Sequence, residues 1–209
     1  MKTEESWARE GNRYTSDLFS LLGTIILWVF WPSFNGLLAT GAARHRAVIN
    51  TYLRSVEGDW LWITRDLLPS LMASTAMTFV ISGLMGHKKF APEDIQNATL
   101  AGGVVVGASA DMVLQVGQVD VYRYGIIKLR SSLLQPYGAV TAGTVAGVVS
   151  CLGYKVLTGR VMEKLGIHDT CGVNNLHGVP GLMAAILSII VTLAASEESW
   201  GPELYKVTP

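Results

Sequence analysis

The most constraining feature of the sequence is an uncharged stretch near its C-terminal end, residues 170–196, which contains a single histidine, His177. A stretch of more than about 20 apolar residues is long enough to cross a bilayer as an α-helix. His177 is the only side chain in this stretch that takes a proton near neutral pH. An ionisable residue inside a membrane helix is costly and therefore marks a functional site by default. We expect the rest of the chain to form a scaffold for a passage that His177 faces.

The composition agrees with a membrane protein. Half of the 209 residues are hydrophobic and only 15% are charged, whereas soluble domains contain about a quarter charged residues. The formal net charge is zero, and no basic cluster is interleaved with aromatic residues, which argues against nucleic-acid binding. Residues 1–17 are polar and lack the layout of a signal peptide. Since a protein with several spans normally starts with a signal or an early span, we expect this chain to be a fragment.

Long runs without charge predict an all-α membrane protein with about five transmembrane helices. A polar segment, residues 1–17, would precede the membrane domain, residues 18–196, and residues 197–209 would form a tail. The predicted spans are residues 18–43, 67–86, 95–110 (continuing to 119), 131–154 and 170–196. Trp28 and Trp31 are bulky membrane aromatics of the first span, which Pro32 is expected to kink.

Local patterns inside and between these runs predict packing and helix ends. Two glycine pairs are spaced four residues apart, which puts each pair on one helix face where a neighbouring helix can approach closely. The acids of the segment Pro-Glu-Asp at 92–94 suit the positive end of a helix dipole. Both cysteines are expected to be small buried hydrophobes, with no metal-ligand spacing and no disulfide framework. The residues concerned are Gly103, Gly107, Gly143, Gly147, Cys151 and Cys171.

Five stretches carry a family resemblance. The most specific runs from Asp169 to Gly181 and reads Asp-Thr-Cys-Gly-Val-Asn-Asn-Leu-His-Gly-Val-Pro-Gly. The others are Phe-Trp-Pro-Ser-Phe-Asn at 30–35, His-Arg-Ala-Val-Ile-Asn-Thr-Tyr at 45–52, Ile-Gln-Asn-Ala-Thr-Leu-Ala-Gly-Gly-Val at 95–104 and Gln-Pro-Tyr-Gly-Ala at 135–139. Together, and in this order, they resemble the Rh glycoprotein branch of the ammonium transporter family, from its sixth to its tenth span.

The resemblance implies a fold and a set of site residues. Members of this family are trimers, and each subunit has its own narrow hydrophobic pore built from two inverted five-helix repeats. Two histidines line the pore and two phenylalanines gate its outer mouth, one of each from each repeat. On this chain, the resemblance assigns the pore histidine of the second repeat to His177, the gate phenylalanine to Phe34 and the acid eight residues before the histidine to Asp169. The first repeat, with the partner histidine and phenylalanine, has no counterpart here.

Two further segments depart from the family pattern. Residues 54–69 and 115–134 have no family counterpart, although the residues on either side of each segment still match. We interpret them as insertions, from retained introns or gene-model errors, with lineage-specific loops as the alternative. With them, lysines and arginines are divided evenly between the two sides of the membrane. Without them, the positive residues favour the side of the N-terminus, which the positive-inside rule makes cytoplasmic.

The chemistry of ammonia explains why a histidine would line such a pore. An ammonium ion loses its hydration in a narrow apolar tube, whereas neutral ammonia does not suffer this cost. Apolar surroundings favour a neutral imidazole, which donates a hydrogen bond from one nitrogen and accepts one at the other. The alternative for His177 is a packed histidine bonded to a neighbouring helix. The pore role of Phe34 rests on the resemblance alone, and the alternative is an ordinary aromatic facing lipid or the core.

Three polar residues near His177 complete the predicted site. Asp169 precedes a helix, where it either caps backbone N–H groups or takes part in handling ammonium. Asn174 and Asn175 lie within about one helical turn of His177. We expect them to line the pore with it, where they would bond helix to helix or fix the orientation of the imidazole.

The leading functional prediction is passive conduction of ammonia or ammonium by an Rh-type channel, without cofactor, metal or covalent chemistry. It implies a multi-pass protein of the plasma membrane, in contact with lipid and trimeric in its intact form. The alternative is a truncated, non-conducting or structural membrane subunit. An intramembrane hydrolase using His177 and Asp169 is disfavoured, because neither a Gly-x-Ser-x-Gly nor a His-Glu-x-x-His motif is present. The sequence does not decide between ammonia, ammonium and carbon dioxide as the permeant.

Overall fold

The computed structural model describes residues 13–37, 47, 51, 70–85, 90–110, 136–162, 164, 169 and 171–194. In these residues every regular element is helical, which confirms the predicted all-α class. The predicted insertions at 54–69 and 115–134 lie outside the described residues. The elements are α2 (Tyr14–Asn35), α4 (Ser70–Met85), α5 (Pro92–Asn97), the 3₁₀-helix η1 (Ala98–Leu100), α6 (Ala101–Val106), α8 (Pro136–Leu152), the π-helices η2 (Gly153–Met162) and η3 (Asn174–Gly178), and α9 (Val179–Ala194).

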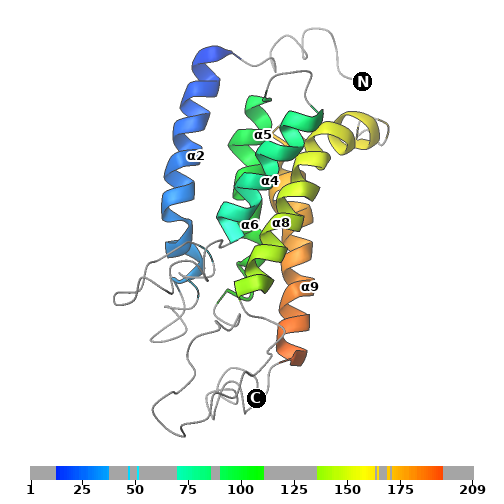
Figure 1. The fold of residues 1–209 in the computed structure, drawn as a ribbon. Coiled ribbons are helices and arrows are strands. Elements are labelled where there is room, and N and C mark those ends of the chain that lie inside the picture. The colour runs from blue at the N-terminus through cyan, green and yellow to red at the C-terminus, as the bar shows by residue number, and fades with distance from the viewer. Residues whose placement is uncertain are drawn as a thin grey trace, which may run out of the picture.

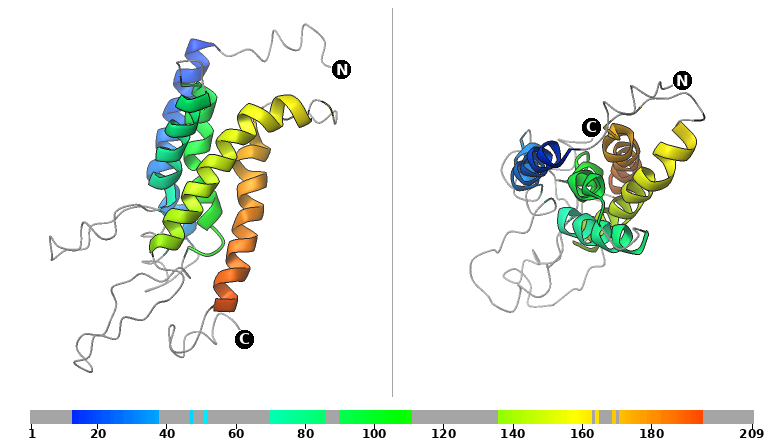
Figure 2. Two further views of the ribbon diagram at one scale, coloured as in Figure 1. Left: turned by 45° about the vertical axis from the view of Figure 1, so that its right-hand side comes forward. Right: turned by 90° about the horizontal axis from the view of Figure 1, so that it is seen from above.

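The helices alternate in direction and surround one central segment. In Figure 1 the chain descends through α2, rises through α4, descends through α5 and α6, rises through α8 and descends through α9. Viewed from above in Figure 2, the segment α5–α6 lies in the middle, with α2, α4, α8 and α9 around it. The contacts agree, because α6 touches each of these four helices.

Three of the predicted spans form helices that are long and apolar enough to cross a membrane: Tyr14–Asn35, Gly138–Thr158 and Asn174–Leu193. The predicted second span corresponds to the shorter apolar helix Ser70–Met85. The predicted third span is not one straight helix, because η1 interrupts it between α5 and α6. No glycine or proline lies at this interruption, so the sequence pattern gave no sign of it.

Hydroxyl groups of neighbouring helices donate hydrogen bonds to backbone carbonyls of the interrupted segment. Thr24 of α2 donates to the carbonyl of Gln96 at 2.8 Å. Ser74 of α4 donates to the carbonyl of Thr99 at 2.7 Å, and Ser70 donates to that of Gly102 at 2.6 Å. A helix break inside a membrane is tolerated when nearby serine and threonine side chains bond the freed backbone groups. The interruption is therefore stabilised by residues far away in the sequence.

Glycines bring three helices into backbone contact. A Cβ atom on Gly143 of α8 would lie 2.2 Å from the carbonyl oxygen of Ser70, and one on Gly147 would lie 2.6 Å from that of Ser74. A Cβ on Gly102 of α6 would also meet Ser70, at 2.0 Å. The close approach predicted from the pair Gly143 and Gly147 is thus confirmed, and α4 is the neighbour.

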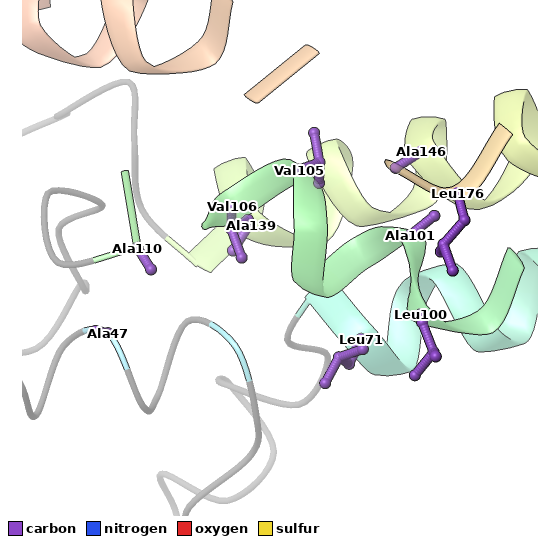
Figure 3. Packing of buried hydrophobic residues seen from close by; sticks show 10 residues of the cluster. All are labelled: Ala47, Leu71, Leu100, Ala101, Val105, Val106, Ala110, Ala139, Ala146 and Leu176. Carbon is purple, nitrogen blue, oxygen red and sulfur yellow. The ribbon is translucent and has the colours of Figure 1, made fainter. Parts of the chain in front are cut away.

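The apolar core lies around the central segment. Figure 3 shows its side chains, most of which come from α4, η1, α6, α8 and η3, whereas Ala47 and Ala110 lie outside these elements. Trp28 and Trp31 of α2 are partly buried against this cluster, so these two membrane aromatics face the interior of the bundle. The buried members are Ala47, Leu71, Leu100, Ala101, Val105, Val106, Ala110, Ala139, Ala146 and Leu176.

Candidate functional site

Three aromatic rings form a row between α2 and η3. The imidazole of His177 is stacked on the indole of Trp31, with ring centroids 6.3 Å apart and an interplanar angle of 15°. On its own helix, Trp31 lies 6.4 Å from Phe34, with the two rings tilted by 46°. His177 is exposed, and 65% of Phe34 is exposed. We call Phe34, Trp31 and His177 the aromatic row.

The position of Trp31 depends on a glycine of α6. A Cβ atom on Gly103 would lie 2.3 Å from the indole Nε1 of Trp31, so no other residue leaves room for this ring. The end of α2 is also bonded to the same place, because Asn35 Nδ2 donates to the carbonyl of Gly103 at 3.0 Å. The same amide donates to Thr51 Oγ1 at 2.9 Å. The C-terminal turn of α2, which carries Trp31 and Phe34, is therefore fixed to the central segment.

Asp169 caps the segment that carries His177. Its Oδ1 accepts a hydrogen bond from the backbone N–H of Val173 at 2.9 Å, and its Oδ2 accepts one from Asn174 at 2.9 Å. Both carboxylate oxygens thus hold backbone donors at the start of η3, where an acid also complements the positive end of the helix dipole. Of the two roles predicted for Asp169, these contacts match capping.

The two asparagines predicted to lie beside His177 have different surroundings. Asn175 is only 1% exposed, and its Nδ2 donates to Thr158 Oγ1 of η2 at 2.6 Å. Its side chain therefore faces η2 and bonds helix to helix, whereas His177 is exposed. Asn174 is partly exposed, and its Oδ1 lies 2.7 Å from where a Cβ on Gly178 would be. The structure thus separates the pair that the sequence grouped together.

Sequence reasoning did not include Trp31 in the site. Its spacing of three residues from Phe34 puts both on one face of α2 and was the available signal. The helix contact that brings Trp31 to His177 is long-range, and no local pattern indicates it. In the described residues, no group of three or more metal-ligating side chains occurs.

Asp94, outside the row, lies in the first helical turn as expected and also makes contacts that the sequence did not indicate. The sequence placed this acid in the first turn of a helix, as a partner of the helix dipole, and α5 does begin at Pro92. Asp94 is nevertheless only 2% exposed, and its Oδ2 lies 2.7 Å from Lys155 Nζ of η2. The same oxygen accepts a hydrogen bond from Ser82 of α4 at 2.5 Å. The carboxylate therefore joins α4, α5 and η2.

The cysteines differ from each other. Cys151 is buried, as expected for a small hydrophobic residue. Cys171 is exposed, so the expectation that both are buried is wrong for this residue. It lies in the turn before η3, next to Gly172, whose φ of 67° favours glycine. Both thiols are free.

Comparison with known proteins supports the resemblance. The chain matches the Ammonium Transporter Family over residues 2–119 and 130–206. The interval without a match lies inside the predicted insertion at 115–134, whereas the other predicted insertion, at 54–69, lies inside a matched range. Both insertions stay predictions.

Similar proteins cover the chain almost completely. Over 208 residues, or 99% of its length, it is 43% identical to the Ammonium transporter Rh type B of Homo sapiens and 44% identical to that of Xenopus tropicalis. The chain spans only 38% and 37% of the length of these relatives.

The fold is also similar to a solved structure, described as "Nitrosomonas europaea Rh50 and mechanism of conduction by Rhesus protein family of channels". The TM-score is 0.64 at 27% identity, over 95% of this chain and 47% of that one.

Proposed function

Because the chain belongs to the ammonium transporter family, we propose that it forms one wall of a passive pathway for ammonia or ammonium across a membrane. The observation that carries this proposal is the exposed imidazole of His177, stacked on Trp31 within a helix long and apolar enough to span a bilayer. An imidazole exposed to lipid on such a helix costs free energy, so we propose that His177 faces a passage. The proposal includes no cofactor and no enzymatic step.

The stacked geometry suits a small neutral solute. The indole of Trp31 lies nearly parallel to the imidazole, with ring centroids 6.3 Å apart, and we propose that a solute approaches the edge of the imidazole that carries the nitrogens. A neutral imidazole offers one donor and one acceptor at that edge. Ammonia matches this pair because it both donates and accepts hydrogen bonds. An ion would lose its water there without gaining an opposite charge.

Phe34 is proposed as the gate at the mouth of this pathway. Its ring is largely exposed and lies next to Trp31 at the C-terminal end of α2. An aromatic face attracts a cation by a cation–π interaction, which would gather ammonium before it loses a proton. Asn174, at the start of η3 and partly exposed, is the remaining polar side chain that we propose to line the pathway.

The proposed pathway needs further helices. His177 and Phe34 are exposed on this chain, so the described helices provide only one side of a passage. We propose that the remainder of a family member closes the other side, and that the closed unit assembles as a homotrimer in the plasma membrane. The same exposure leaves a non-conducting or structural subunit as the alternative for this chain on its own.

A chimera tests the conduction proposal. The matching segment of human Ammonium transporter Rh type B would be replaced by this chain, and internal pH would be followed in liposomes after an ammonium pulse. We expect the chimera to conduct and its His177→Ala variant to fall to the rate of empty liposomes. A chimera with Leu193→Ala, on an exposed site of the same helix, should conduct like the unmodified chimera.

Three results would count against the proposal. Unchanged flux in the His177→Ala chimera would remove His177 from the pathway. A correctly assembled chimera without flux would favour the non-conducting subunit. Flux through the 209-residue chain alone, which we expect not to conduct, would contradict the role of a single wall.

A further inference from the structure

Two π-helical segments lie against each other next to the aromatic row. Segment η2 continues α8, and segment η3 carries His177 and continues into α9. π-Helical segments are rare in proteins, and those that occur often lie at functional sites. One hydrogen bond joins them, from Asn175 Nδ2 to Thr158 Oγ1 at 2.6 Å. A second bond connects η2 to the turn before η3, where Tyr154 Oη donates to the carbonyl of Gly172 at 2.8 Å.

Glycines leave room for side chains at this contact. A Cβ atom on Gly153 would lie 2.7 Å from Oδ1 of Asn175, and one on Gly172 would lie 2.1 Å from the Tyr154 ring. Segment η3 therefore has η2 on one side. The Trp31 ring of α2 meets η3 at His177. The orientation of the imidazole depends on how η3 is held between these two neighbours.

Among the described residues, the Asn175 side chain has one hydrogen-bond partner, Thr158. In the described part of the chain, the buried Oδ1 of Asn175 has no hydrogen-bond partner, and its Nδ2 bonds only Thr158. The Thr158 hydroxyl itself donates towards the carbonyl of Gly153 at 3.4 Å, which leaves its oxygen free to accept. Without this hydroxyl, a whole buried amide would be left unsatisfied, and the cost of such a group would favour a rotation of η3.

We propose that Thr158 is a positioning residue for His177: its hydroxyl, by accepting the hydrogen bond of Asn175, sets the rotation of η3 and keeps the imidazole parallel to Trp31. The functional meaning of this contact rests on the proposed pathway, but the contact itself does not. Asn175 and His177 belong to the same five-residue π-helix, so a rotation that exposes the amide also moves the imidazole.

The test uses fluorine NMR of the full chain in lipid nanodiscs, with 5-fluorotryptophan at its six tryptophans. Replacement of Trp31 and of Trp28 by phenylalanine assigns their resonances. The displacement of the Trp31 resonance in His177→Ala defines the signature of the stacked rings. We expect Thr158→Val to shift Trp31 by most of that displacement, and Thr158→Ser, which keeps the hydroxyl, to restore the original position.

A matched control separates positioning from general damage. Thr78 of α4 is fully buried, and among the described residues its hydroxyl bonds the carbonyl of Ser74 in its own helix and no other group. Thr78→Val should leave the Trp31 resonance in place. The Trp28 resonance reports folding, because Trp28 donates to Thr75 at 3.2 Å between α2 and α4, and it should not move in Thr158→Val.

The outcomes are distinct. A Trp31 resonance that keeps its position in Thr158→Val would overturn the proposal. If Trp28 moves as well, the double variant Thr158→Val/Asn175→Leu replaces the single one, because removal of both polar partners avoids an unsatisfied amide. A Trp31 resonance that returns to its original position in the double variant supports positioning, and one that stays displaced as in Thr158→Val overturns it. A chimera that fails to conduct while the signature persists would reject the proposed pathway and leave the positioning role intact.

Discussion

The interface of α4 with α6 and α8 and the aromatic row use opposite kinds of side chain. At the interface, Ser70, Ser74 and Thr78 are fully buried, and glycines bring the helices into backbone contact. In the row, Phe34 and His177 are large and exposed. Lipid supplies little hydrophobic force between helices, so close packing and hydroxyl bonds must hold the bundle together.

The contrast distinguishes the residues that hold the bundle together from those that we propose to meet the solute. The interface leaves no space that a solute could enter, since its atoms are already in contact. The row exposes an imidazole, which is costly against lipid and therefore favours contact of His177 with a solute or with further helices. Changes to the packed region should therefore alter stability, and changes to the row should alter flux.

The largest expected effect comes from the ion pair of Asp94 and Lys155 in the packed region. Asp94→Asn removes one charge and leaves the Lys155 ammonium, 16% exposed, without its partner at 2.7 Å. Loss of one member of a buried pair typically costs about 3–5 kcal/mol. Measured by unfolding in mixed SDS and maltoside micelles, the free energy of unfolding of the variant should fall by an amount of this order. The double variant Asp94→Asn/Lys155→Met should recover most of it, and an equally unstable double variant would mean that the pair is not the cause.

The role of Asp94 shows where sequence reasoning ends. Proline and acids at 92–94 predicted a helix start correctly, because that signal is local. The burial of Asp94 is set by Lys155 and Ser82, which come from other helices, and no local pattern records them. Likewise the glycine pair of α8 predicted a close contact but did not identify its neighbour.

The candidate site, too, was predictable only where it depends on signals that are local in the sequence. The uncharged run pointed to His177 and the start of its helix pointed to Asp169, since both depend on neighbours along the chain. The partner ring of Trp31 and the burial of Asn175 depend on how η3 is rotated between α2 and η2. A π-helix changes that rotation, and helical periodicity of 3.6 residues per turn does not anticipate it.

A smaller effect is expected from Gly143→Ala. The added Cβ would lie 2.2 Å from a backbone oxygen of α4, so the helices must separate, and overpacking of this kind typically costs about 1–3 kcal/mol. Gly23→Ala on α2 is the matched control, because nothing lies within 4 Å of its added Cβ. There the better helix propensity of alanine should stabilise the chain by up to about 1 kcal/mol. The same unfolding measurement compares them, and equal losses at both sites would contradict the close contact.

The smallest effect on stability is expected in the aromatic row, from Phe34→Ala. Its ring is 65% exposed and meets Trp31 at 6.4 Å, so the loss should be at most about 1 kcal/mol. Phe79→Ala is the matched control, because Phe79 is 40% exposed, packs edge-on against Phe90 at 5.3 Å and is not a member of the row. The two variants should have nearly the same free energy of unfolding.

In the chimera, however, Phe34→Ala should change the initial rate of internal pH change after the ammonium pulse, whereas Phe79→Ala should not. The physical reason is that, of these two phenylalanines, Phe34 is the one whose exposed ring lies beside Trp31, where a cation can be held before it enters. Equal rates in the two variants, at equal protein content, would remove the distinction between a region that holds the bundle and a region that meets the solute.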